Sequence, residues 1–131
     1  MGTVPLISDD AASAEVLAVF NDIRAARETE YVNNFWRALA NDPALLAATW
    51  DRLKEVMGPG ELDPLVKEML YIAVSVANGC TYCIHSHSAA ARAKGMSAAQ
   101  QGELLAVIGM AMQTNGLVTA MQVEVDDAFL V

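Results

Sequence analysis

The sequence predicts an all-α fold, a single-domain bundle of about six helices. Residue patterns that begin and end helices recur along the chain: Asp-Pro pairs, a capping box, and glycines that follow apolar runs. Apolar residues are spaced three and four apart, and no segment shows the sustained alternation of apolar and polar residues that is typical of a strand. A chain of 131 residues suits one core, so we expect one domain over residues 1–131.

Three helices are predicted in the first half of the chain. The first runs from near Ser13 to about Glu28, because its apolar residues form a stripe at helical spacing. A shorter helical piece spans residues 32–40. Asp42 offers its carboxylate as an N-cap and Pro43 occupies the first helical position, so a third helix begins there and ends at the sequence Gly-Pro-Gly.

Two more helices meet at the sequence Gly-Cys in the second half. Asp63-Pro64 repeats the helix-starting pair and opens a helix that should end at Gly79, a residue suited to a left-handed cap. The next helix begins around Cys80 and ends at Gly95. The stretch that carries both cysteines therefore straddles a helix junction.

The C-terminal third is more apolar. Ser97 and Gln100 form a capping-box pattern that starts a helix leading to Gln113. Residues 104–123 carry no charge and are about as long as a membrane span. The sequence Gln-Thr-Asn-Gly interrupts this run, so we predict two buried helix segments around a turn, the second over about 117–129, and no span.

Composition limits the partners and the compartment. Hydrophobic residues make up 54% and charged residues 18%, which is more apolar surface than a monomer needs to bury, so we expect a homo-oligomer. The net charge of −8 argues against nucleic acid or an anionic membrane as the main partner. Two cysteines make no disulfide scaffold and the N-terminus does not resemble an export signal, so a reducing cytoplasm is the expected compartment.

Residues 78–87, NGCTYCIHSH, contain both cysteines and both histidines of the chain. Cys80 and Cys83 lie one turn apart on one helix face, in a first turn whose free N–H groups and dipole favour a thiolate. His87, four residues after Cys83, extends this face as an adjacent base. His85 is rotated by about 200° from Cys83 at the helical period, and we predict a surface or interface position for it.

The cluster of cysteines and histidines in residues 78–87 has other interpretations. Cys80, Cys83 and His87 could supply three zinc ligands, but a closed structural site needs four. A covalent haem is excluded, because Ile84 follows the CxxC where the attachment motif needs histidine. The cysteines could also be ordinary core residues. We predict no metal and no bound cofactor.

Glu68 places a carboxylate on a helix row that is otherwise apolar, with Ile72 and Val76. A buried carboxylate is unusual without a partner, and desolvation would make it a better proton carrier near neutral pH. The alternative is a surface glutamate on a poorly phased helix. Lys67 and Tyr71 fall on a different face and look like ordinary boundary residues.

The spacing of these residues resembles a known family. Glu68, Cys80, Cys83 and His87 follow the pattern E-x11-CxxC-x3-H, which is similar to the signature of the alkylhydroperoxidase D-like (AhpD-like) family of the carboxymuconolactone decarboxylase superfamily. The resemblance covers roughly residues 32–112, the core of the single domain. It implies an all-helical subunit assembled into trimers or hexamers, with thiol-dependent peroxidase or disulfide reductase activity.

The resemblance also implies a role for each residue. Cys83 would attack the peroxide and Cys80 would resolve the sulfenic acid to a disulfide; residue chemistry alone does not rank the two sulfurs. His87 would take the proton from Cys83, and Glu68 would complete the relay through water. The substrate would be a small peroxide or disulfide. Electrons would come from an external dithiol, on a lipoyl-bearing or thioredoxin-like partner.

One residue departs from the family pattern. Tyr82 stands where the prototype peroxidase has a second histidine between its cysteines, and a phenol is a poor base at neutral pH.

Two other functions are alternatives to the peroxidase. One is a decarboxylase-like or isomerase-like enzyme that uses Glu68 and His87 on a small carbonyl acid. The other is a helical binding module whose cluster is structural or binds zinc.

Overall fold

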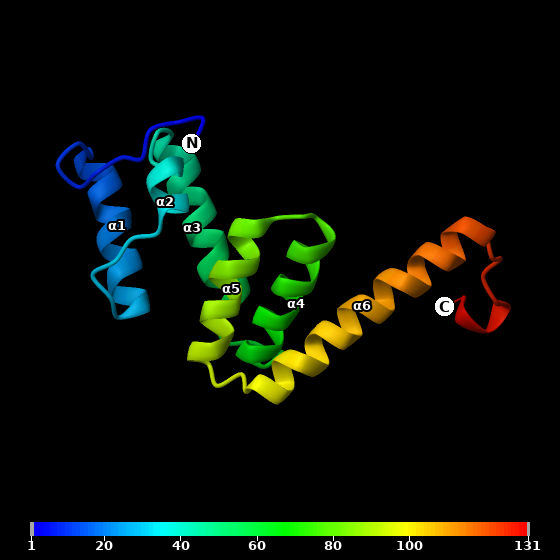
Figure 1. Cartoon of the computed structure of the whole chain (residues 1–131). Coiled ribbons are helices and arrows are strands. Elements are labelled where there is room, and N and C mark those ends of the chain that lie inside the picture. The colour runs from blue at the N-terminus through cyan, green and yellow to red at the C-terminus, as the bar shows by residue number, and fades with distance from the viewer. Residues whose placement is uncertain (1, 131) are drawn as a thin grey trace. The chain divides into compact units, whose positions relative to one another are not determined.

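The computed structural model describes residues 2–130 and confirms the all-α prediction. No strand occurs among these residues. Six α-helices are followed by a short 3-10 helix (Figure 1): α1 Ala14–Arg27, α2 Asn34–Leu39, α3 Pro43–Met57, α4 Pro64–Ala77, α5 Thr81–Ala93, α6 Ala98–Met121 and η1 Asp127–Phe129.

The helices group into two compact units, one ending at Gly58 and the other beginning at Pro59. The first contains α1 to α3, and the second contains α4 to α6. That the whole chain folds as one domain stays a prediction. A single cooperative transition on thermal unfolding, seen alike by near-UV and far-UV circular dichroism, is the expected result.

The first unit has its own apolar core. Trp36 and Trp50 are both buried and meet edge to face, with ring centroids 5.2 Å apart. The cap predicted at Asp42 is formed, since its side-chain oxygen accepts the N–H of Leu45. Ser13, near which the first helix was predicted to start, also caps its helix, with Oγ accepting the N–H of Val16. The core consists of Val16, Phe20, Ile23, Val32, Trp36, Ala40, Leu46 and Trp50.

The second unit is built on the pair α4 and α5. Its core consists of Ile72, Ala91, Met96 and Ile108. The chain turns from α4 into α5 at Gly79, whose φ of 68° is left-handed as predicted. Gly79 N–H donates to the Val76 carbonyl at 3.1 Å and Cys80 N–H donates to the Ser75 carbonyl at 2.9 Å, which together form a Schellman motif. This motif fixes the backbone of Cys80 at the end of α4.

Replacing Gly79 with alanine is expected to lower the free energy of unfolding by about 1–2 kcal/mol, because a Cβ is disfavoured in the left-handed region. No atom lies within 4 Å of the added Cβ, so conformation and not a clash is the cause. Urea denaturation measures the change. Gly102→Ala, inside α6 and equally free of clashes, is the matched control and should be neutral or stabilising by about 0.5–1 kcal/mol. Equal losses in both variants would contradict this account.

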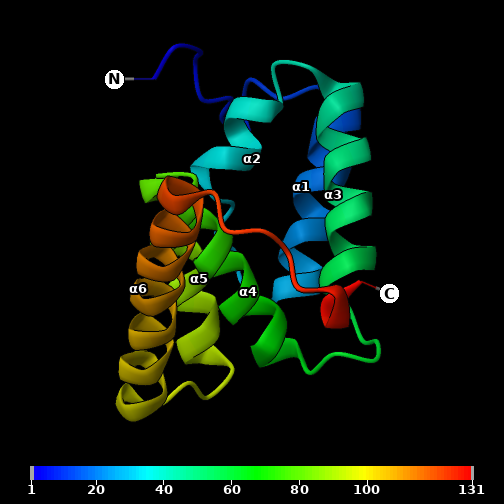
Figure 2. The same ribbon diagram turned by 90° about the vertical axis from the view of Figure 1, so that its right-hand side faces the viewer.

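Residues 104–121 of the apolar run lie in one continuous helix, so the prediction of two segments around a turn was wrong. α6 is unbroken over Ala98–Met121 (Figure 2). Thr114, inside the predicted turn, donates from Oγ1 to the Met110 carbonyl at 3.1 Å, as Ser and Thr do within helices. Gly116 costs only about 1 kcal/mol there. The capping box at the start of α6 and the good helix formers around Gly116 outweigh that cost.

Most of α6 is exposed, contrary to the prediction that this run is buried. Ile108 is its buried residue and Leu104 is partly buried, and both pack in the core of the second unit. Every described residue after Ile108 is exposed. Apolar residues occur on all sides of the helix, so packing on α4 can cover only part of them. In Figure 1 the second half of α6 leads away from α4 and α5.

The predicted helix over about 117–129 is only partly present. α6 ends at Met121 because Gln122 is left-handed, with a φ of 50°, and η1 forms a separate short turn. By length and composition alone, α6 is the described helix that could cross a membrane. Helices that pack in soluble proteins meet the same criterion, and the absence of a span stays a prediction.

Candidate active site

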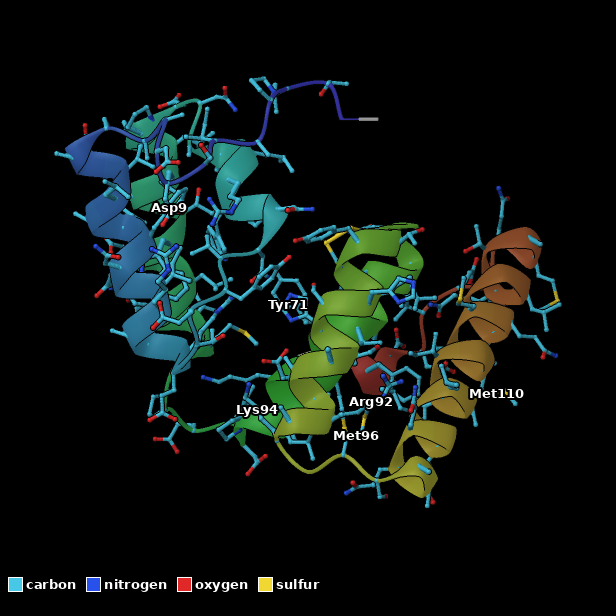
Figure 3. All side chains as sticks on the ribbon, turned by 60° about the vertical axis from the view of Figure 1, so that its left-hand side comes forward. Asp9, Tyr71, Arg92, Lys94, Met96 and Met110 are labelled. Carbon is cyan, nitrogen blue, oxygen red and sulfur yellow. A yellow bond between two sulfur atoms is a disulfide. The ribbon has the colours of Figure 1, made fainter. Side chains whose placement is uncertain are left out.

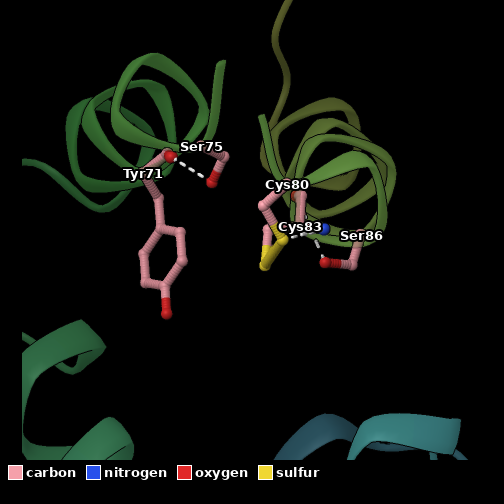
Figure 4. The surroundings of a disulfide bond; sticks show 5 residues. All are labelled: Tyr71, Ser75, Cys80, Cys83 and Ser86. Atoms are coloured by element: carbon pink, nitrogen blue, oxygen red, sulfur yellow. Dashed lines mark hydrogen bonds between the residues drawn. A yellow bond between two sulfur atoms is a disulfide. The ribbon is translucent and has the colours of Figure 1, made fainter. Parts of the chain in front are cut away.

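The two cysteines are joined at the start of α5. Cys80 and Cys83 form a disulfide with their Cα atoms 5.4 Å apart (Figure 4). Cys80 is the N-cap of α5, and its Sγ accepts the N–H of Cys83 at 3.3 Å. The Schellman motif thus holds the backbone of Cys80, and the first turn of α5 holds its side chain. The predicted placement on one face, at a helix N-terminus, is confirmed.

Glu68 on α4 lies in the interior as predicted, with 4% of its surface exposed. Each carboxylate oxygen has its own partner on α5. Oε2 lies 2.7 Å from Nδ1 of His87, and Oε1 accepts from Nζ of Lys94 at 2.9 Å. Glu68 therefore meets His87 directly, and the expectation of an intervening water was wrong.

The pKa of Glu68 is lowered, not raised. Burial alone would raise this pKa, but the hydrogen bonds from His87 and Lys94 and the charges of the same two groups together outweigh burial. The expectation that desolvation makes Glu68 a proton carrier near neutral pH was therefore wrong. An ionised carboxylate only accepts hydrogen bonds, so Nδ1 of His87 carries the proton between them, and Nε2 of the neutral ring is free to accept another.

Glu68 is expected to make folding stability pH-dependent. Because its pKa is lower in the folded protein than the ordinary value of 4.5, its contribution is complete above that pH and is lost as the pH falls through the folded pKa. Urea denaturation of wild type and Glu68→Gln from about pH 6 down to about pH 3 measures this, and the difference in unfolding free energy should shrink as the pH falls. Asp9 and Asp22 also have lowered pKa values, but these residues are present in wild type and in Glu68→Gln alike, so their contributions cancel in the difference. A constant difference across this range would contradict the prediction.

Tyr71 belongs to the site, although sequence reasoning treated it as an ordinary boundary residue. Its ring stacks on the imidazole of His87, with centroids 3.6 Å apart and planes 19° from parallel. It projects from α4 beside the helix that carries the disulfide (Figure 4). Stacking limits rotation of the imidazole and so helps to hold Nδ1 on Glu68. Tyr71 lies three residues after Glu68, one turn along α4, and this spacing was the signal that could have found it.

His85 and Tyr82 both lie on the surface of α5. His85 is exposed, as its rotation from Cys83 predicted. Tyr82 is 45% exposed in the first turn, beside the two cysteines in sequence. Within residues 2–130, His, Cys, Asp and Glu side chains form no group of three that could hold a metal ion.

Comparisons with known proteins identify the family of the chain. The sequence model of the Carboxymuconolactone decarboxylase family matches residues 43–124, well over half of the chain. The chain belongs to the carboxymuconolactone decarboxylase family. The match spans α3 to α6 and includes the four residues of the E-x11-CxxC-x3-H pattern.

Within the carboxymuconolactone decarboxylase family the chain is AhpD-like. The crystal structure of an alkylhydroperoxidase AhpD core from Rhodospirillum rubrum ATCC 11170 has 63% sequence identity and a TM-score of 0.97, and the match covers 100% of this chain and 98% of that one. The alkyl hydroperoxide reductase AhpD of Solibacter usitatus (strain Ellin6076) is 32% identical over 106 residues, 79% of this chain. The match spans 58% of that relative's length. The family and fold implied by the sequence resemblance are confirmed.

Proposed function

We propose that this protein is a thiol-dependent peroxidase of the alkyl hydroperoxide reductase type. One observation carries the proposal: a Cys80–Cys83 disulfide at the start of α5, on the same helix as a histidine that is held by a buried carboxylate. A vicinal dithiol can be oxidised and reduced repeatedly, and an oriented base can supply the thiolate. The names of both relatives agree with this chemistry.

The proposed reaction begins with the reduced pair. Nε2 of His87 takes the proton of the Cys83 thiol, and the thiolate attacks the terminal oxygen of a hydroperoxide. The O–O bond breaks, Cys83 becomes a sulfenic acid, and the alkoxide leaves as an alcohol after taking the proton from His87. Glu68 stabilises the imidazolium that exists between these steps and holds the ring in the required tautomer. It does not itself carry the proton.

The sulfenic acid is then resolved within the same helix turn. The thiol of Cys80 attacks the Cys83 sulfur, a disulfide forms, and water leaves. An external dithiol reduces the disulfide by thiol–disulfide exchange and becomes a disulfide itself. A lipoyl group or a thioredoxin-like protein has this chemistry, and a reducing cytoplasm, the predicted compartment, would keep such a donor reduced. A small disulfide is the alternative substrate of the same pair.

A thiol count combined with intact-protein mass spectrometry tests the proposal. The reduced protein is treated with one equivalent of cumene hydroperoxide. Loss of both thiols, with a mass decrease of about two hydrogens and with Cys80 linked to Cys83, is the expected result. Two remaining thiols and an unchanged mass, under conditions in which free dithiothreitol is oxidised, would exclude the proposed function.

A decarboxylase-like function is the second candidate, because the pair Glu68–His87 could act as a base on a small carbonyl acid without either sulfur. The contact of 2.7 Å between these side chains favours it, and the family name agrees with it. Alkylation of both thiols distinguishes the two functions, since only the decarboxylase-like activity would survive it.

Elemental analysis tests the remaining alternative, a zinc-binding module, for which about one tightly held zinc per chain is expected.

We expect a homo-oligomer, a trimer or hexamer as the sequence resemblance implies, formed in part through α6. Met110, in the exposed second half of that helix, is 59% exposed (Figure 3). A charge buried in an apolar interface is unfavourable, so Met110→Lys should weaken assembly. Light scattering coupled to size-exclusion chromatography measures the mass. Asn115→Lys adds the same charge at an exposed polar position of α6 that is rotated by about 140° from Met110, and it serves as the control. A monomeric wild type would contradict the expectation.

A further inference from the structure

Lys94 is the one partner of Glu68 that neither the family pattern nor the proposed reaction uses. Its Nζ donates to Oε1 of Glu68 at 2.9 Å, while Oε2 of the same carboxylate meets Nδ1 of His87 at 2.7 Å. The side chain of Glu68 is 6% exposed and that of Lys94 is 39% exposed. The ammonium group thus reaches from the edge of the second unit to a buried oxygen.

The end of α5 places Lys94 for this contact. Lys94 is the C-cap residue of α5, and Gly95 follows it with a left-handed φ of 95°. Gly95 N–H donates to the Arg92 carbonyl at 3.0 Å and Met96 N–H donates to the Ala91 carbonyl at 3.0 Å, which together form a second Schellman motif. The position of Lys94 is therefore set by a defined helix end and not by a mobile loop.

Lys94 also lies on the face of α5 that carries the site. It follows His87 by seven residues, two helical turns, and the fully buried Ala91 lies between them on the same row. Helix α4 packs against α5 more extensively than against any other helix. Glu68 on α4 thus meets both residues at once, and one carboxylate connects two turns of α5.

We propose that Lys94 is a positioning residue of the active site, which holds Oε1 of Glu68 so that Oε2 stays on Nδ1 of His87 and Nε2 stays available as the base. For its effect on turnover this rests on the proposed peroxidase function. A carboxylate with one partner could rotate or present either oxygen. With both oxygens bound, its plane is fixed, and so is the edge of the imidazole that it contacts.

Lys94 has an electrostatic effect as well. From α4, Glu68 and Tyr71 face His87; from α5, Lys94 shares the carboxylate, and Cys83 precedes His87 by one turn. The residues by which α6 packs in this unit, Leu104 and Ile108, carry no charge. Lys94 thus offsets part of the negative charge that His87 faces. Without Lys94 the whole carboxylate charge acts on the imidazole and favours its protonated form, which cannot act as a base.

Arg92 provides a matched control. It is the other cation at the end of α5, where positive charge interacts favourably with the helix dipole. Its guanidinium contacts Gln101 at 3.4 Å, and it points to a different side of the helix from Lys94 (Figure 3). Arg92→Met therefore removes a cation from the same turn without removing a partner of Glu68.

Histidine NMR of the disulfide form tests the proposal without any turnover. The chain has two histidines, and the exposed His85 serves as an internal reference. In the wild type, the nitrogen-15 shifts of neutral His87 should show the proton on Nδ1. In Lys94→Met the Nδ1 tautomer should lose its dominance, because the carboxylate is no longer fixed, and the imidazolium fraction of His87 measured at one fixed pH should rise. Lys94→Arg, which keeps charge and donors, should restore the wild-type spectrum.

The other outcomes separate this proposal from the proposed function. In the reduced protein, Lys94→Met should slow peroxide-dependent thiol loss, and the loss of rate should be larger at lower pH, where more of the imidazole is protonated. An effect of Arg92→Met equal to that of Lys94→Met would mean that Lys94 acts only on the helix end and would overturn the proposal, as would an unchanged tautomer and imidazolium fraction of His87 in Lys94→Met. If the wild type consumes no peroxide while the NMR shift occurs, the peroxidase function fails and the positioning role stands.

Discussion

Cys83→Ser is expected to lose peroxide turnover completely, whereas Cys80→Ser should reduce one equivalent of peroxide and then stop. A serine hydroxyl at position 83 is not a nucleophile toward peroxide at neutral pH, so the first step fails. In Cys80→Ser the first step proceeds and no thiol resolves the sulfenic acid. The single event is measured as peroxide consumed per chain by the pre-reduced proteins with no free dithiol present, because a free dithiol would itself reduce the sulfenic acid, together with the protein mass after reaction. Turnover of wild type and Cys83→Ser is measured separately with excess lipoyl dithiol.

The same two variants supply their own stability control. Cys80 occupies the N-cap of α5, a position at which serine is a preferred residue, so the reduced Cys80→Ser protein should keep its fold. Cys80→Ser should also gain a mass of about one oxygen on peroxide treatment, or form a mixed disulfide with the donor. Multi-turnover activity in Cys83→Ser would overturn the assignment of the attacking sulfur, whereas full activity in both variants would overturn the thiol mechanism.

Glu68→Gln is expected to slow the first oxidation of Cys83 on the order of 100-fold to 10,000-fold, the range for loss of an oriented acid–base group. Glutamine matches the shape of glutamate but carries no charge, and its amide can donate to Nδ1 and so select the wrong tautomer of His87. Single-turnover thiol loss after mixing with cumene hydroperoxide, measured across pH, reports this step before any external reductant acts.

Glu103→Gln is the matched control for the carboxylate variant, because Glu103 is an exposed residue of α6 and lies outside the site. It should keep the wild-type rate. Circular dichroism and urea denaturation of Glu68→Gln show whether the second unit remains folded. A folded Glu68→Gln protein that oxidises at the wild-type rate would exclude Glu68 from the mechanism.

The sequence by itself determined the helices and the cysteine face. Each of the six α-helices begins at a predicted residue or within two residues of one, because caps, proline at the first position and glycine after the end act over only a few residues. The single face of Cys80, Cys83 and His87 follows from the same helical period. The α6 prediction failed because a polar cluster and one glycine were read as a turn, when the flanking helix formers and the capping box continue the helix through them.

Only the tertiary structure decided how the buried carboxylate is used. Spacing along α4 showed that Glu68 lies on an apolar row, but its partners lie 19 and 26 residues away in sequence, on another helix. The direct contact with His87, the ammonium of Lys94 on the second oxygen and the Tyr71 ring on the imidazole all depend on how α4 packs on α5. The direction of the pKa shift depends on the same packing, because burial and paired charges act in opposite directions and only their geometry sets the balance.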